Sequence, residues 1–290
     1  MRQTRVNTFA FYVKLWFSFV LLGISFWDKF KIGFFLLFRK LSQVCVKFFF
    51  PVHAKDNTLG AFAFWGAQIK LLNATIACRA WHPEDLMTAY YSLVLIPKML
   101  DMLGVEKLLD PNAVFLDIGA HVGFWSLVVS KNYNCKSYAF EPNPETFKHL
   151  QNHIKMNNLE DKIIPVQKAL WKEETTLLFY LSRDSGSCSV ILKKEMGCLS
   201  IEVDTLDHFL FSQGISPKNV CLVKIDVEGA EREVLMGGKQ LLKEGKPAIF
   251  FEAWNSTYLQ GIREVLNSYN YNEPVQIDRL DYFVSPSESR

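Results

Sequence analysis

A chain of 290 residues in which 49% of the side chains are hydrophobic is long and apolar enough to bury the core of one large domain. Its net charge of +2 provides no general attraction for nucleic acid, and we expect no nucleic-acid partner. The charge is uneven, because residues 1–50 carry eight Lys or Arg against one acid, which makes this segment +7 and leaves residues 51–290 at −5.

The first predicted unit is a basic, apolar and strongly aromatic segment, residues 1–55. Thr8 to Trp27 would span about 30 Å as a helix, close to the thickness of a bilayer core. Lys14 interrupts this run and leaves only Leu15–Trp27 uncharged. The segment can therefore span a membrane, lie in its interface as a basic amphipathic anchor, or pack as a helical cap on the following domain. Because aromatic and basic residues together suit an interface, we favour contact of residues 1–50 with a membrane surface.

Residues 56–111 are predicted to form an extension ahead of the main domain, which covers residues 112–290. The pattern indicates strands at Leu59–Leu72 and Thr75–Trp81 and a helix at Glu84–Leu103 that is interrupted at Pro97. We expect this extension to cover the ligand side of the main domain and to shape its pocket.

The main domain begins with a strand, Val114–Leu116, that leads into a glycine turn and a helix at Phe124–Ser130. Gly119 and Gly123 allow a sharp turn beside the helix start, where a nucleotide-like ligand can bind. A dinucleotide site would have a glycine at the position of Asp117 and glycines three residues apart instead of four. The acid would repel a pyrophosphate but could accept hydrogen bonds from an ammonium group.

Glu141 adds a second constraint on the ligand. It ends a second strand, Ser137–Phe140, 22 residues after Gly119, where an acid can accept hydrogen bonds from both hydroxyls of a ribose. An ammonium acceptor together with a ribose acceptor suggests S-adenosylmethionine as the cofactor. The next helix is predicted at Glu145–Asn157, after the breaker that begins at Pro142.

The remainder of the domain alternates between apolar strands and helices, which predicts a mostly parallel sheet. Further strands are expected at Ile163–Leu170, Ile201–Leu206, Val220–Ile225, Pro247–Glu252, Val275–Ile277 and Tyr282–Val284, a hairpin at Thr175–Leu181 with Cys188–Leu192, and helices at Ala230–Met236 and Tyr258–Tyr269.

Three acids lie at the predicted carboxyl ends of two of these strands, where ligands bind in open α/β sheets. Asp226 and Glu228 follow the strand Val220–Ile225, and Glu252 ends the next strand. Asp226 or Glu228 could instead cap the following helix. We place function ahead of capping at Asp226.

The runs 115–123 (Phe-Leu-Asp-Ile-Gly-Ala-His-Val-Gly), 139–144 (Ala-Phe-Glu-Pro-Asn-Pro) and 224–231 (Lys-Ile-Asp-Val-Glu-Gly-Ala-Glu) resemble the FkbM family of S-adenosylmethionine-dependent methyltransferases. The resemblance covers roughly Asn112–Trp254, and its most specific part is the run 224–231. It implies a Rossmann-like class I α/β fold with a mostly parallel seven-stranded sheet and helices on both faces, here preceded by an apolar helical N-terminal segment. The cofactor-binding residues expected from the motifs and the resemblance are Asp117, Gly119, Ala120, His121, Gly123, Glu141, Pro142 and Ala169.

Ala169 lies where the wider superfamily places a small residue against adenine, whereas Lys168 replaces the usual acid or asparagine beside it. Methyl transfer to a hydroxyl needs in-line placement of the acceptor and removal of its proton. We expect Asp226 to be the base, with Glu228 and Glu252 orienting the acceptor or substituting for the base. His121 could also act, although a histidine in such a turn more often only packs.

The predicted activity is O-methylation of a hydroxyl on a sugar, glycan or small metabolite. The alternative is a non-catalytic, membrane-tethered binding module that kept the fold. A metal is not favoured, although Asp226, Glu228 and Glu252 together could hold a hard cation. The six cysteines are scattered without a Cys-x-x-Cys pair, which suggests free thiols and a cytoplasmic location. The sequence leaves the oligomeric state open.

Overall fold

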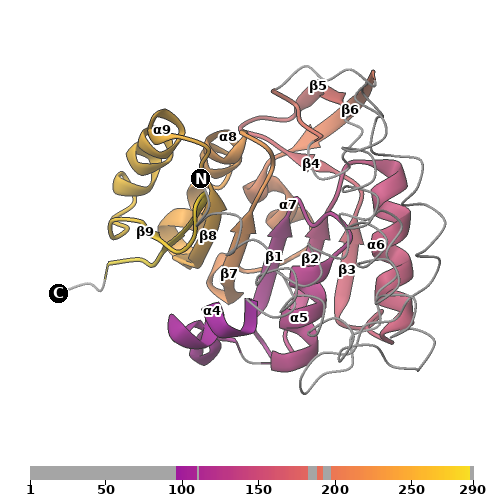
Figure 1. Cartoon of the computed structure of the whole chain (residues 1–290), viewed down its shortest axis with the longest axis horizontal. Coiled ribbons are helices and arrows are strands. Elements are labelled where there is room, and N and C mark those ends of the chain that lie inside the picture. The colour runs from indigo at the N-terminus through magenta and orange to yellow at the C-terminus, as the bar shows by residue number, and fades with distance from the viewer. Residues whose placement is uncertain (1–95, 110, 182–187, 192–196, 288–290) are drawn as a thin grey trace, which may run out of the picture. The chain divides into compact units, whose positions relative to one another are not determined.

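The computed structural model describes residues 96–109, 111–181, 188–191 and 197–287 (Figure 1). The predicted segment 1–55 and the predicted strands Leu59–Leu72 and Thr75–Trp81 lie outside these residues. Of the predicted helix Glu84–Leu103, the described part is helix α4, Ile96–Met102, and a short 3-10 helix, Val105–Leu108, follows it. The predicted boundaries between units stay predictions.

The domain is built on a seven-stranded sheet with the order β3-β2-β1-β7-β8-β10-β9 (Figure 1). The strands β3, β2, β1, β7 and β8 run parallel, whereas β10 is antiparallel to β8 and to β9. This arrangement confirms the predicted α/β class and the mostly parallel sheet. The strand bounds are β1 Val114–Ile118, β2 Lys136–Phe140, β3 Ile163–Val166, β7 Val220–Ile225, β8 Ala248–Glu252, β9 Val275–Gln276 and β10 Asp281–Val284.

Helices cover both faces of this sheet, so the central strands are buried on both sides. The side chains of β1 alternate: Leu116 and Ile118 join a core that includes α7, α8 and α9, whereas Phe115 contacts Trp125 of α5 on the other face. Helix α6 packs beside α5 on that second face, where His153 contacts Phe124. The helix bounds are α5 Phe124–Tyr133, α6 Pro144–Met156, α7 Leu206–Ser212, α8 Glu231–Met236 and α9 Ser256–Asn267, with a π-helix at Leu241–Gly245.

The four predicted helices of the main domain are confirmed to within a few residues, because their ends carry local signals. Asn143 caps α6 by accepting from the Glu145 N–H at 3.0 Å, and Asn255 caps α9 in the same way. Within the part of the chain that the structure describes, no helix is long and apolar enough to cross a membrane.

Two predictions between β3 and β7 were wrong. The expected single strand Ile163–Leu170 is split, because β3 ends at Val166 and Ala169–Leu170 form a separate strand, β4. Among the described residues of the expected hairpin of Thr175–Leu181 with Cys188–Leu192, the pairing is a single bridge between Tyr180 and Ser189.

These segments form a second sheet instead, with the order β4-β6-β5. Strand β5, Thr175–Tyr180, pairs antiparallel along its whole length with β6, Cys198–Asp204, and β4 pairs parallel with the end of β6. The predicted strand Ile201–Leu206 therefore begins earlier and stops at Asp204. Thr205 then caps α7, which begins at Leu206 and lies outside the elements that the sequence pattern predicts.

Candidate active site

Four strands of the sheet end at the same edge, and a predicted site residue follows or ends each of them. Ile118 of β1 is in register with Phe140 of β2 and with Ile225 of β7, and Ile225 is in register with Phe251 of β8. Gly119, Glu141 and Asp226 come directly after the first three strands, and Glu252 ends β8. The structure therefore brings the predicted site together along the carboxyl edge of the sheet.

Asp117 is fully buried, and one of its oxygens is committed to the start of helix α5. Its Oδ2 accepts hydrogen bonds from the Ser126 N–H at 3.0 Å and from the Ser126 hydroxyl at 2.7 Å. Its Oδ1 has no hydrogen-bond partner among the described residues. Burial raises the pKa of Asp117, although the nearby Lys224 ammonium and the bonds from Ser126 oppose this shift.

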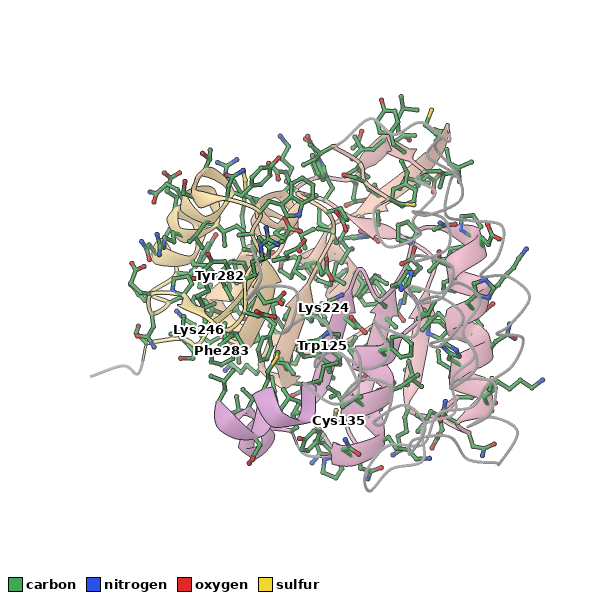
Figure 2. The ribbon with its side chains drawn as sticks, in the orientation of Figure 1. Trp125, Cys135, Lys224, Lys246, Tyr282 and Phe283 are labelled. Atoms are coloured by element: carbon green, nitrogen blue, oxygen red, sulfur yellow. The ribbon has the colours of Figure 1, made fainter. Side chains whose placement is uncertain are left out.

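The cation that balances this acid is Lys224, to which the sequence analysis assigned no role. Lys224, which is labelled in Figure 2, lies on β7. It is in register with Asp117 of β1 and is 6% exposed. Its Nζ lies 3.6 Å from Asp117 Oδ1 and 3.4 Å from Asp226 Oδ2, and it donates to the Gly119 carbonyl at 2.6 Å. Burial opposes its charge, but Asp226 and Asp117 hold the pKa of Lys224 above its usual value.

The role of Lys224 could have been predicted from the alternating direction of side chains along a strand. Residues two apart on a strand face the same side, so Lys224 and Asp226 are expected to point together. A lysine inside an otherwise apolar buried strand also needs an acidic partner. Both signals stand in the run 224–231.

The glycines of the turn are required by the protein's own packing. Gly119 has φ +75, and a Cβ built there would lie 1.8 Å from the Asp226 carbonyl oxygen. Gly123 has φ +89, and its Cβ would lie 2.4 Å from Leu150 of α6. The N–H groups of Gly119 and Ala120 both donate to the Phe140 carbonyl, at 3.1 and 2.8 Å. The turn is thus fixed against the ends of β2 and β7.

Glu141 is 7% exposed and ties the second strand end to the glycine turn. Its Oε2 accepts from the His121 N–H at 3.0 Å, and its Oε1 accepts from the Asn143 N–H at 2.8 Å. Burial raises the pKa of Glu141 to about 7, against the lowering effect of these two bonds. Since a carboxylate offers about four lone pairs, Glu141 keeps acceptor capacity for a ligand.

The three predicted catalytic acids also converge. One carboxylate oxygen from each of Asp226, Glu228 and Glu252 lies within 4.8 Å of the others. The Asp226 side chain is 47% exposed, whereas Glu252 is partly buried and accepts from Trp254 Nε1 at 2.9 Å. Burial and the neighbouring Asp226 charge raise the pKa of Glu252 to about 7. We call this cluster the acid rim, and within it the partly buried Glu252 can accept a proton near neutral pH.

Capping of helix α8 is the alternative role for the acids after β7, and the loop that precedes this helix is held by its first residue, Glu231. Its Oε1 accepts from the Val227 N–H at 3.0 Å and from the Gly229 N–H at 3.2 Å. The helix has no side-chain cap at its N-cap position, Ala230. Glu228 instead adopts φ +59, and its carbonyl accepts from the Ser189 hydroxyl at 2.9 Å.

The two remaining predicted residues lie less centrally. Pro142 is partly buried between Glu141 and Asn143. Ala169 lies in β4, opposite Val203 of the smaller sheet, and not in the central sheet. Lys168, which replaces the expected adenine-binding acid, forms an ion pair with Asp204 at 3.0 Å.

Comparison with known protein families shows to which family this site belongs. The Methyltransferase FkbM domain matches residues 117–273, which include the glycine turn, Glu141 and the acid rim. The chain belongs to the FkbM methyltransferase family. Membership confirms the predicted family, makes residues 117–273 a methyltransferase domain and supports S-adenosylmethionine as its methyl donor.

Individual curated relatives are similar in sequence to part of this chain. The hexuronic acid methyltransferase AglP of Haloferax volcanii is 31% identical over 128 residues, which are 44% of this chain and 51% of that protein. Methyltransferase 1 of Beauveria bassiana is 28% identical and is matched over 43% of this chain and 58% of its own length. The match thus spans about half the length of each of these two relatives.

Among solved structures, the methyltransferase FkbM of Methylobacillus flagellatus KT is 18% identical with a TM-score of 0.45, and the match covers 60% of this chain and 43% of that one.

Proposed function

We propose that this methyltransferase transfers the methyl group of S-adenosylmethionine to a hydroxyl of a sugar, glycan or small metabolite. The observation that carries the proposal is the convergence of Asp226, Glu228 and Glu252 within 4.8 Å at the end of the sheet where the glycine turn lies. The turn and the rim are in direct contact, because Gly119 packs on the carbonyl of Asp226. A similarity to a hexuronic acid methyltransferase supports a sugar-type acceptor.

The residues present fit S-adenosylmethionine. Asp117 Oδ1 is buried and faces Lys224 Nζ at 3.6 Å but accepts no hydrogen bond from a described group, and a donor such as the ammonium of the cofactor would satisfy it. Glu141 keeps lone pairs for the ribose hydroxyls, and the backbone from Gly119 to Gly123 lies between these two acids. Ala120, His121, Pro142 and Ala169 are proposed to complete the cofactor site.

The bound cofactor supplies an electrophilic methyl group, so the protein's own task is to position the acceptor and to remove its proton. Within the acid rim, Asp226 is the base proposed from the sequence, but its Oδ2 faces the Lys224 ammonium at 3.4 Å. Glu252, with its pKa raised to about 7, is better matched to accept a proton near neutral pH. We therefore assign proton removal to the Asp226–Glu252 pair, with Glu252 as the preferred acceptor and Glu228 orienting the hydroxyl.

Hydroxyl-rich acceptors suit this rim for a second reason. Trp254 and Tyr258 are partly buried beside Gly229, with ring centroids 5.4 Å apart, and the Trp254 indole N–H holds Glu252 in place. An apolar ring surface next to hydrogen-bond acceptors matches the mixed apolar and hydroxyl faces of a sugar.

The test measures cofactor binding by calorimetry and methyl transfer to a panel of sugars. Glu252→Gln and Asp226→Asn should bind the cofactor normally, and the variant that removes the base should lose about 10²- to 10⁴-fold in turnover. The wild-type rate should rise as pH increases through about 7, and Glu252→Gln should lose this rise. Glu202→Gln, an exposed acid on β6, is the matched control.

Unchanged turnover in both variants would remove the base assignment. Absence of cofactor binding by the folded wild-type protein would favour the non-catalytic binding module.

Contact of residues 1–50 with a membrane remains part of the proposal, and it rests on their charge of +7 and their aromatic content. The full-length protein should float with anionic liposomes and lose this binding at high salt. If it stays unbound at low salt, a packed helical cap is the better interpretation.

A further inference from the structure

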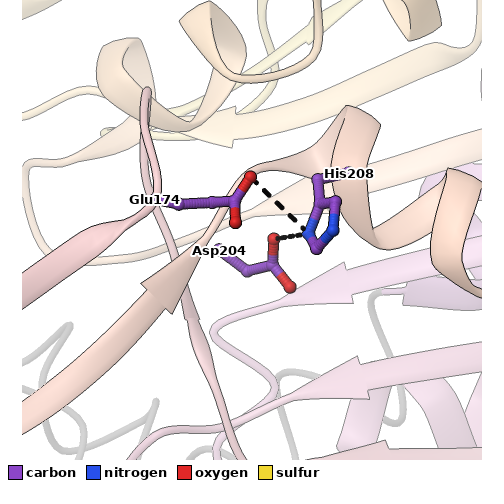
Figure 3. A group of neighbouring side chains, drawn as sticks. All are labelled: Glu174, Asp204 and His208. Carbon is purple, nitrogen blue, oxygen red and sulfur yellow. Dashed lines mark hydrogen bonds and ion pairs between the residues drawn. The ribbon is translucent and has the colours of Figure 1, made fainter.

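A second cluster of ionisable side chains lies beside the three-stranded sheet and takes no part in the proposed methyl transfer. Figure 3 shows Glu174, Asp204 and His208 pointing toward one another. His208 Nδ1 lies 2.7 Å from Asp204 Oδ1 and 3.8 Å from Glu174 Oε1. One donor atom from each of the three lies within 4.8 Å of the others.

The local fold brings these residues together from three separate elements. Asp204 is the last residue of β6, and Glu174 lies in the turn between β4 and β5, which both pair with β6. His208 lies in the first turn of α7, where its N–H donates to the Thr205 hydroxyl at 3.1 Å. Thr205 also donates its N–H to Asp204 Oδ1 at 2.8 Å. The end of β6 and the start of α7 thus hold the acid and the imidazole in a fixed relation.

The two oxygens of Asp204 face different partners. Lys168 Nζ lies 3.0 Å from Oδ2, whereas His208 Nδ1 contacts Oδ1. The Lys168 ammonium therefore leaves Oδ1 accessible from the side of His208. Asp204 is 4% exposed, whereas the side chains of Glu174 and His208 are 61% and 47% exposed. The cluster therefore combines one anchored, buried carboxylate with two ligand groups that solvent and ions can reach.

We propose that Glu174, Asp204 and His208 bind one Zn²⁺ ion, with a water molecule as the fourth ligand. The ion would replace the proton between His208 Nδ1 and Asp204 Oδ1, and that proton would pass to solvent. Tetrahedral zinc with bonds of about 2.0 Å places neighbouring donor atoms about 3.3 Å apart. The Nδ1–Oδ1 distance of 2.7 Å must therefore open slightly, and the Nδ1–Oε1 distance of 3.8 Å must close by a similar amount.

The donor set selects this ion over the commoner hard cations. Mg²⁺ and Ca²⁺ prefer six or more oxygens, whereas a neutral imidazole with two carboxylates suits zinc and its first-row neighbours. Two carboxylates also balance the charge of a divalent ion. The proposal thus adds a metal site to a protein whose sequence did not favour a metal. This site is independent of the proposed methyl transfer.

The test is a calorimetric titration of the full-length, chelator-treated protein with Zn²⁺, repeated with Co²⁺ and followed by absorption. We expect one ion per chain, with affinity reduced at least tenfold in His208→Gln and several-fold in Glu174→Gln. Glu173→Gln changes the neighbouring exposed acid, which lies outside the cluster, and should leave the affinity unchanged. Zinc should also raise the unfolding temperature of the wild type but not that of His208→Gln.

Several results would overturn the proposal. Equal zinc affinity in the wild type and in His208→Gln would show that the ion binds elsewhere. Loss of binding in Glu252→Gln would place it at the acid rim. A Co²⁺ spectrum with thiolate bands would assign it to cysteines, and absence of binding would leave the cluster as a network of ion pairs.

Discussion

The carboxyl edge of the sheet has two halves, one with Asp117 and Glu141 and one with the acid rim. They differ in how deeply their carboxylates are buried and hydrogen-bonded. On the proposed cofactor side, Asp117 and Glu141 are almost fully buried, and they accept hydrogen bonds from Ser126, His121 and Asn143. On the proposed acceptor side, the Asp226 side chain is 47% exposed and Glu252 is only partly buried. The protein's own hydrogen bonds therefore fix the carboxylates of the proposed cofactor side, whereas the proposed acceptor side presents a more exposed carboxylate to a substrate.

Lys224 joins these two halves, and its removal should have the largest effect. In Lys224→Met the buried Asp117 loses its balancing charge, which should cost about 4 kcal/mol of unfolding free energy. Urea unfolding measures this loss. The double variant Lys224→Met with Asp117→Asn should recover part of it, because the acid no longer needs a partner. Losses that simply add would show that the two residues act independently.

The acceptor side also depends on a buried acid, Glu231, which is 1% exposed and holds the loop from Val227 to Gly229. Burial raises the pKa of Glu231 from its usual 4.5 to about 7. Between these two pH values, the folded protein therefore holds a proton on Glu231 that the unfolded chain has released. Its contribution to stability is then greatest below pH 4.5 and falls as pH rises to about 7. The loss over this range is at most about 3 kcal/mol.

Glu231→Gln keeps an oxygen acceptor but cannot ionise. The wild type should lose up to about 3 kcal/mol more unfolding free energy than this variant between pH 5 and pH 8. Denaturant unfolding at both pH values measures the difference. Equal losses would mean that Glu231 is ionised in the folded protein throughout this range.

The positions of the predicted acids could be derived from the sequence because each depends on a local rule. A strand ends where its apolar run ends, and parallel strands bring their carboxyl ends to one edge. Glu141, Asp226 and Glu252 therefore lie at the expected ends of strands, whereas Asp117 lies within β1, which continues two residues beyond the predicted Leu116. The same rule identified the central sheet and its order of elements.

The smaller sheet could not be derived in this way. Strand β4 has only two residues, and its partner β6 is paired at Ala169–Val203 and Leu170–Asp204, far along the chain. A pattern that depends on neighbours in the sequence cannot specify such a pairing. For the same reason the meeting of Glu174 with Asp204 and His208 became visible only in the folded structure. Ser126 and Glu231 were missed because their roles depend on the partner that the fold places beside them, the Asp117 carboxylate for Ser126 and the Val227 and Gly229 N–H groups for Glu231.

The contact between the two halves also gives a smaller and more local test. Gly119→Ala places a methyl group against the Asp226 carbonyl, where the ideal Cβ lies 1.8 Å from the oxygen, at φ +75. Gly104→Ala is the matched control, because Gly104 has φ +65 but nothing within 4 Å of its Cβ position. Both changes incur the strain of a left-handed backbone, about 1 kcal/mol, and only Gly119→Ala adds a steric clash of about 2 kcal/mol. The difference in unfolding free energy between the two variants therefore isolates the cost of separating the glycine turn from the end of β7.

Gly119→Ala should also weaken cofactor binding, whereas Gly104→Ala should not. If both variants unfold alike and bind the cofactor equally, the two halves are not held together by this contact.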